Sequence, residues 1–218
     1  MKVHDHEVEG LIFDFDGTLA DSMWVWEEVD RQFFRKRGIP FDDAAVEEVA
    51  VLGFESGSEY VIEHFGLDER PGDIIEEWKT SAIEGYSTQV RLKPGAREYL
   101  QRCRAQGMPM AIATSLQRHL LEPCLKNNGV LQLFDTLCIC DELHCGGKSN
   151  PTVYLEAAAC LGVPAQRCAV FEDVVTPARS AKQAGAYVVG VLDPHKQQAT
   201  EALKATADHF ITTWSELL

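Results

Sequence analysis

The chain has 218 residues, of which 45% are hydrophobic and 25% are charged, as in a globular protein with one large domain or a core plus a small insert. Its 34 acidic residues against 20 Lys and Arg give a net charge of -14, which argues against binding to nucleic acid or to an anionic membrane surface. A small anionic substrate is compatible with this charge, because one metal ion and one lysine can reverse the field inside a pocket.

The chain has no stretch close to the ~20 apolar residues of a membrane span, and its start, MKVHDHEVEG, lacks the apolar core of a signal peptide. We therefore expect a cytoplasmic protein. Its seven cysteines are an odd number spread over apolar segments, which is not typical of a disulfide framework. The spacing of Cys138, Cys140, His144 and Cys145 does not match a usual zinc site, so a buried strand at residues 136–140 is favoured.

Apolar strands and helices alternate through most of the chain. Strands are predicted at residues 8–13, 108–113, 136–140, 168–171 and 187–191, and helices over 94–104, over 118–126, from 151 to a stop at 162, and from 177 to a stop at 185. Pro123 is expected to end or kink the second of these helices. The alternation predicts an α/β fold, with a parallel sheet covered by helices on both faces.

The segment over residues 21–89 interrupts this alternation, since it has helical periods and no clear strand. We interpret it as an all-helical cap inserted after the first strand, over the carboxyl edge of the sheet. The catalytic core would then comprise residues 1–20 and 90–218, with linkers near 18–22 and 86–93.

Polar and charged residues that could bind a ligand or take part in catalysis follow the predicted strands. Asp14, Thr114 and Asp173 stand at strand ends, and Lys148 lies in the loop after the third strand. Ligands of open parallel sheets bind outside the carboxyl ends of the strands. We therefore expect these residues to converge on one edge, although they span most of the sequence.

The strongest motif is Asp14-Phe15-Asp16-Gly17-Thr18, directly after the first strand. An aspartate can attack phosphorus to form an aspartyl-phosphate, and a second carboxylic acid can protonate the leaving oxygen. Gly17 allows a turn close to the phosphate. An Asp-Gly turn without function is the alternative, but the apolar strand before the motif and Leu19 after it disfavour that reading.

In this motif the sequence resembles the haloacid dehalogenase superfamily, and within it the phosphoglycolate phosphatase and β-phosphoglucomutase-like proteins. The resemblance covers nearly the whole core, includes residues 19–22, and is weakest in the cap. It implies a Rossmann-like parallel sheet with a helical cap after the first strand. It also implies that Asp14 is the nucleophile and Asp16 the general acid and base.

Two further family motifs concern the phosphate. Thr114 ends an apolar strand, and its hydroxyl and nearby N–H groups, with Ser115 as a second donor, would hold a phosphate oxygen. Lys148 precedes a helix and would bridge the nucleophile and the phosphate, although the family's first proline is replaced by Ser149. A P-loop reading of residues 146–149 is rejected, because Glu142 stands where its first glycine belongs.

The fourth motif is the acidic pair Glu172-Asp173 after a strand. Mg²⁺ prefers oxygen ligands, and the carboxylates of Asp14 and Asp173 would supply two. By the resemblance, the backbone carbonyl of Asp16 would supply a third, and Glu172 would bind directly or through water. Val174 and Pro177 depart from the family's Ser and Gly, which removes a possible hydroxyl contact and leaves the metal carboxylates in place.

These motifs together predict a magnesium-dependent phosphatase for a small phosphorylated metabolite, such as a sugar phosphate, a phosphoglycolate-like compound or a nucleotide, and a monomer is expected. A phosphomutase of the β-phosphoglucomutase type is the alternative. It is disfavoured because Trp26 stands where such enzymes carry a histidine. A haloacid dehalogenase attacks carbon and needs no magnesium, so Asp16, Glu172 and Asp173 argue against it. A binding domain without catalysis is disfavoured because Asp14, Asp16, Lys148 and Asp173 are all present. The sequence leaves two roles for Trp24 and Trp26, contact with the substrate or packing in the core.

Overall fold

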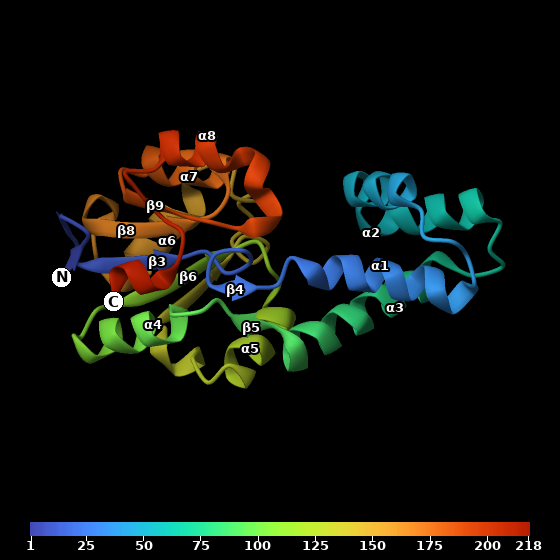
Figure 1. Ribbon diagram of the computed structural model, residues 1–218, viewed down its shortest axis with the longest axis horizontal. Helices are drawn as coiled ribbons and strands as arrows, with labels where there is room; N and C mark the ends of the chain where they lie inside the picture. The colour runs from blue at the N-terminus through green and yellow to red at the C-terminus, as the bar shows by residue number, and fades with distance from the viewer. The chain divides into compact units, whose positions relative to one another are not determined.

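The computed structural model describes residues 1–218, apart from the side chains of residues 47, 48, 50, 51, 53 and 197. It divides into two compact units (Figure 1). Residues Met1–Ser22 and Val90–Leu218 form the first, here called the core unit, and Met23–Gln89 form the second, here called the helical unit.

The core unit is built on a six-stranded sheet whose neighbouring strands are all parallel, in the order β10-β9-β8-β3-β6-β7 (Figure 1). The strands are β3 (Gly10–Phe13), β6 (Met110–Thr114), β7 (Thr136–Ile139), β8 (Cys168–Glu172), β9 (Tyr187–Val191) and β10 (His209–Ile211). The first strand of the sheet along the chain, β3, therefore lies between β6 and β8. This confirms the predicted α/β fold with a parallel sheet.

Successive residues of β3 point to opposite faces of the sheet, and each face has its own helices. Ile12 belongs to an apolar cluster with side chains of α6 (Thr152–Leu161), α7 (Val175–Gln183) and α8 (Thr200–Thr206). Phe13 instead meets Tyr99 of α4 (Ala96–Ala105), at 6.4 Å between ring centroids. Helix α5 (Arg118–Asn127) buries four apolar side chains, Leu120, Leu121, Cys124 and Leu125.

Short elements complete the core unit. Strand β1 (Lys2–Val3) pairs with β2 (His6–Glu7), and β4 (Ala20–Asp21) pairs with β5 (Arg91–Leu92), both antiparallel. The 3₁₀ helices are η2 (Leu131–Leu133), η3 (Ala165–Arg167), η4 (Pro194–Ala199) and η5 (Trp214–Leu217). In η5 the side chain of Trp214 is buried, and its indole N–H donates to the carbonyl of Thr18 at 3.2 Å. The segment around Trp214 thus supports the loop after β3.

Some predicted boundaries were wrong. Helix α5 runs to Asn127, one residue beyond its predicted end, and is not ended by Pro123, because its buried apolar face packs in the core and outweighs the loss of one backbone hydrogen bond. Strand β3 starts at Gly10 rather than at residue 8, and α7 starts at Val175, ahead of Pro177.

The helical unit contains α1 (Trp24–Arg37), α2 (Asp43–Phe65), α3 (Pro71–Glu84) and the π-helical turn η1 (Gly85–Gln89). Helix α2 begins where the Asp42 carboxylate accepts backbone N–H groups of Ala44 and Ala45, at 3.0 and 3.1 Å. Phe33 and Trp78 pack at 5.7 Å between ring centroids, which joins α1 to α3. Within the described part of the chain, no helix is both long and apolar enough to span a membrane.

Candidate active site

The carboxyl ends of the central strands open into one cavity of about 290 Å³ within the core unit. All the predicted site residues except Gly17 line it together: Asp14, Asp16, Thr114, Ser115, Lys148, Glu172 and Asp173. Residues from strand ends far apart in the sequence therefore meet at this edge. The cavity is also lined by Ser149, Val174 and Pro177, three departures from the family pattern, and by Lys196, which sequence analysis did not single out.

Lys148 is the central cation of this cavity. Its Nζ lies 2.5 Å from Oδ1 of Asp14 and also pairs with the carboxylate of Glu172. The side chains of Lys148 and Asp14 are each only 8% exposed, so the ion pair is largely shielded from water. The Thr18 hydroxyl lies 3.1 Å from the other oxygen of Asp14. Asp14 is therefore held from two sides, in a fixed orientation at the end of β3.

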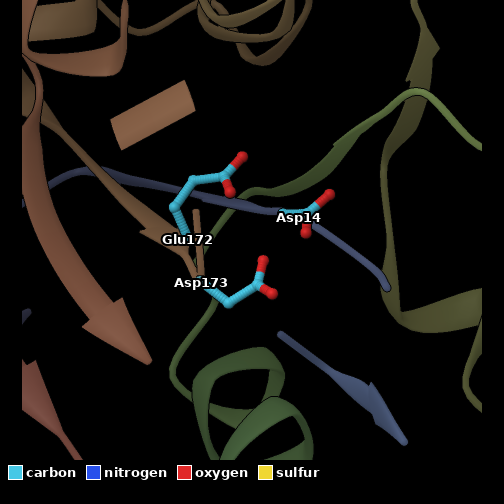
Figure 2. Close-up of side chains that lie close together, drawn as sticks. All are labelled: Asp14, Glu172 and Asp173. Carbon is cyan, nitrogen blue, oxygen red and sulfur yellow. The ribbon is translucent and has the colours of Figure 1, made fainter. Parts of the chain in front are cut away.

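Three buried carboxylates converge at this edge of the sheet (Figure 2), and Lys148 contacts two of them. Asp14, Glu172 and Asp173 each place one carboxylate oxygen within 4.8 Å of the others. The Tyr154 hydroxyl donates to Oε1 of Glu172 at 2.6 Å, whereas Oε2 of Glu172 is buried with no hydrogen-bond partner among the described residues. Lys196 donates to Asp173 at 2.6 Å.

Burial and the repulsion of neighbouring carboxylates oppose the ionisation of Glu172 and Asp173. Burial, reinforced by the charge of Asp14, raises the pKa of Glu172 to about 8, although Lys148 acts in the opposite direction. The same two causes raise the pKa of Asp173 to about 6, against the effect of Lys196. Burial alone would lower the pKa of Lys148, but the two carboxylates beside it outweigh burial and raise that pKa. The cluster thus carries more negative charge than its surroundings stabilise.

A divalent cation fits this donor set. Oxygen ligands from carboxylates suit Mg²⁺ and other hard ions, and the cluster offers three carboxylates around one point. The buried oxygen of Glu172 that lacks a partner would gain one, and a cation would offset the repulsion that raises the pKa values. Asp14, Glu172 and Asp173 are therefore the residues that would hold the ion. Asp16 is predicted to contribute only its backbone carbonyl.

The loop after β3 is fixed by contacts that leave little freedom. Ser22 donates to the carboxylate of Asp16 at 2.6 Å. Gly17 has a φ of 77°, and a Cβ at this position would collide with the Asp173 carboxylate and lie 2.7 Å from Oδ2 of Asp193. Only glycine combines this conformation with such a close approach. The loop can therefore pass close beside the acidic cluster.

Lys93 holds the same loop from outside the cavity. Its ammonium donates to the backbone carbonyl of Gly17, and to that of Leu192 at 2.9 Å. Burial lowers the pKa of Lys93, while the nearby carboxylates of Asp193 and Asp173 act in the opposite direction. The contact joins the loop after β3 to the loop after β9.

Thr114 and Ser115 occupy the turn after β6. Thr114 is buried, and its hydroxyl oxygen accepts the backbone N–H of Leu116 at 3.0 Å. The Ser115 hydroxyl contacts the sulfur of Cys140 at 3.7 Å. Both residues line the cavity, as the motif order predicted, whereas their roles with phosphate stay predictions.

Several functional side chains were missed by sequence reasoning. Thr18 could have been identified from the sequence, because it follows Gly17 in the motif. The contacts of its hydroxyl with both Asp14 and Asp173 were not predicted. Lys93, Lys196 and Tyr154 carried no local signal. They reach the site only because the sheet topology brings their loops and helix to its edge.

Comparison with known proteins places this geometry in a family. Residues 11–191 match the model of the haloacid dehalogenase-like hydrolases. The chain is 30% identical over 191 residues to a validoxylamine A 7'-phosphate phosphatase of Streptomyces hygroscopicus subsp. limoneus, covering 86% of this chain and 87% of that protein. It is 32% identical over 192 residues to hexitol phosphatase A of Escherichia coli K12, covering 85% and 84%.

Solved structures show the same likeness. The crystal structure of a haloacid dehalogenase family hydrolase from Deinococcus radiodurans R1, with bound phosphate and sodium, matches with a TM-score of 0.74. It is 26% identical and covers 97% of this chain and 93% of its own. The chain therefore belongs to the haloacid dehalogenase-like hydrolase family. This confirms both the family predicted from the motifs and the prediction of an enzyme of the phosphatase type.

Proposed function

We propose that the protein is a magnesium-dependent phosphatase that hydrolyses a small phosphomonoester through an aspartyl-phosphate on Asp14. The observation that carries this proposal is the largely buried ammonium of Lys148, which lies between the carboxylates of Asp14 and Glu172 in one cavity. Phosphoryl transfer depends mainly on positioning and on neutralising charge, and these contacts supply both.

In the first half-reaction, a carboxylate oxygen of Asp14 attacks phosphorus, and the bond from phosphorus to the ester oxygen breaks. Protonated Asp16 gives its proton to the departing oxygen, so the product leaves as an alcohol. Lys148 contacts Asp14 and would also attract the phosphate oxygens, which offsets the repulsion between the two anions. Bound Mg²⁺ would supply further neutralisation of that charge.

In the second half-reaction, Asp16 is a carboxylate and accepts a proton from water. The water oxygen bonds to phosphorus as the bond from phosphorus to Asp14 breaks, which releases inorganic phosphate and restores protonated Asp16. The hydrogen bond from Ser22 orients the Asp16 carboxylate for both steps. Thr114 and Ser115 would donate to the phosphate oxygens.

For the substrate, the relatives favour a phosphorylated polyhydroxy compound. One is named a hexitol phosphatase and another a phosphatase of validoxylamine A 7'-phosphate. We therefore expect sugar and sugar-alcohol phosphates to rank above phosphoglycolate and nucleotides in a screen of phosphate release. A phosphomutase would instead convert a hexose phosphate to its isomer and release little phosphate.

The Asp14→Asn variant tests the nucleophile. Phosphate release from sorbitol 6-phosphate should fall by at least about 10³-fold, because the amide cannot form the covalent intermediate. Acid-quenched wild-type protein should carry a phosphoryl group on the peptide that contains Asp14, and the variant should not. Asp5→Asn is the matched control, since the Asp5 side chain is 94% exposed. Near wild-type turnover by Asp14→Asn would rule the mechanism out.

Removal of the metal tests the cofactor separately. Protein treated with EDTA and dialysed should release no phosphate, and Mg²⁺ should restore the rate. Full activity of the stripped protein would contradict magnesium dependence while leaving the role of Asp14 open to the first test.

A further inference from the structure

The helical unit contains a cavity of about 240 Å³, and the described residues that line it all belong to that unit. Three aromatic side chains, three valines and one acid line it. The aromatic residues are Trp26, Phe54 and Trp78, and the acid is Asp30. Its size approaches the lower end of small-molecule sites, which span ~300–1,000 Å³, and such sites are mostly apolar with few polar groups.

The aromatic side chains form a continuous wall. The rings of Trp26 and Phe54 lie 5.8 Å apart between centroids, and those of Phe54 and Trp78 lie 6.2 Å apart. Aromatic faces carry negative electrostatic potential and attract organic cations. Trp26 is 36% exposed, unlike most residues of a packed core, so the wall reaches the surface of the unit.

Two polar groups at the cavity have no partner among the described residues. No hydrogen bond or ion pair to a described residue reaches the Asp30 carboxylate, and burial, with the charge of Glu27, raises its pKa to about 6. The indole N–H of Trp78 is buried and also has no hydrogen-bond partner among the described residues. By contrast, Glu27 on the same helix pairs with Arg31 at 2.5 Å. A half-buried carboxylate without a counterion is costly unless something else supplies the charge.

We propose that this cavity binds an organic ammonium ion with an apolar body, which Asp30 holds by charge and the wall of Trp26, Phe54 and Trp78 holds by cation–π contact. An anion would be repelled by Asp30, and a neutral apolar ligand would leave this carboxylate unpaired. Among the described residues that line the cavity, a hard metal ion would find one carboxylate where it needs several oxygen ligands. The inference does not rest on the proposed phosphatase reaction.

Direct binding to the full-length protein tests the proposal. Benzylammonium and benzyl alcohol have the same apolar body and differ in charge. The indole N–H signal of Trp78 in nitrogen-15 NMR spectra reports occupancy of the cavity. We expect benzylammonium to shift this signal and to bind at least tenfold more tightly than benzyl alcohol. Equal affinities, or no shift with either probe, would overturn the proposal.

Variants locate the effect. Asp30→Asn keeps the shape of the side chain and should abolish the preference for benzylammonium, whereas Glu76→Gln, an exposed acid on α3, should keep it. Retention of the preference in Asp30→Asn would overturn the role of the carboxylate. Because Asn removes a buried charge, this variant should fold, and circular dichroism checks that it does.

Discussion

Buried acids in the two units differ in what neutralises them. In the core unit Asp14 and Glu172 share Lys148, and Asp173 meets Lys196. In the helical unit Asp30 has no such counterion among the described residues. The contrast teaches that the core unit meets part of its buried negative charge with its own lysines, whereas the helical unit offers no described cation to the Asp30 carboxylate.

Among the variants that test the site of the core unit, Asp16→Asn should have the largest effect on turnover. Turnover of sorbitol 6-phosphate should fall by about 10²- to 10⁴-fold, because the alkoxide leaves without a proton and water attacks without a base. With p-nitrophenyl phosphate, whose leaving group needs no proton, a rapid burst of nitrophenolate should precede slow turnover in stopped-flow traces. Mg²⁺ affinity by calorimetry should stay within twofold of wild type. The absence of a burst would show that Asp16 acts on more than proton transfer.

The Lys93→Met variant tests whether a lysine outside the cavity supports the loop that carries Asp16. The change leaves the carbonyls of Gly17 and Leu192 without their charged donor, which costs about 1–3 kcal/mol of unfolding free energy for buried acceptors. We expect kcat to fall roughly tenfold, about 1.4 kcal/mol of activation free energy, because the loop that carries Asp16 loosens. Urea denaturation and steady-state kinetics measure the two effects. Lys126→Met, at an exposed lysine on α5, is the control, and equal behaviour of both variants would remove Lys93 from the catalytic support.

The smallest expected effect is on the stability of the protein and tests the Asp30 carboxylate of the helical unit. Its pKa is about 6 in the folded protein against 3.8 for the free side chain, so folding favours its protonated form. The stability that this provides is fully present below pH 3.8 and is lost as the pH rises through about 6. Asp30→Asn should therefore unfold at a higher temperature than wild type above pH 6, by roughly 2–4 °C for a gain of up to about 1 kcal/mol after screening by solvent. Below pH 4 the two melting curves should coincide, and a constant offset at all pH values would contradict a charge effect.

The sheet edge could be predicted from the sequence because each of its acids directly follows an apolar strand. Asp14 and Asp173 stand at the ends of β3 and β8, and parallel neighbours bring such ends together. Their partners could not be predicted in the same way. Lys93 lies in a loop and Lys196 in the short 3₁₀ helix η4, and most lysines are solvated. Their burial follows from tertiary contacts over long sequence separations.

In the fold, too, elements with a long local pattern could be predicted, whereas features that depend on tertiary packing could not. The five strands of the interpreted alternation exist, whereas β10 was missed because its three residues, His209–Ile211, give too short a pattern to distinguish from a loop. The helical periods of residues 21–89 predicted helices, and three are present. The cavity among them was not predictable, since it depends on how side chains from three helices fail to fill the space between them.

The hydrogen bond from Trp214 to Thr18 has a consequence for biosynthesis. It joins residues 196 positions apart, and a ribosome adding ~5–20 residues per second needs roughly 10–40 s to make that stretch. The loop that carries Asp14 and Asp16 leaves the ribosome before the segment around Trp214 and lacks this support until that segment follows. A nascent chain therefore contains the Asp14 loop before the segment that supports it exists, and the loop is held in place only after residue 214 has been added.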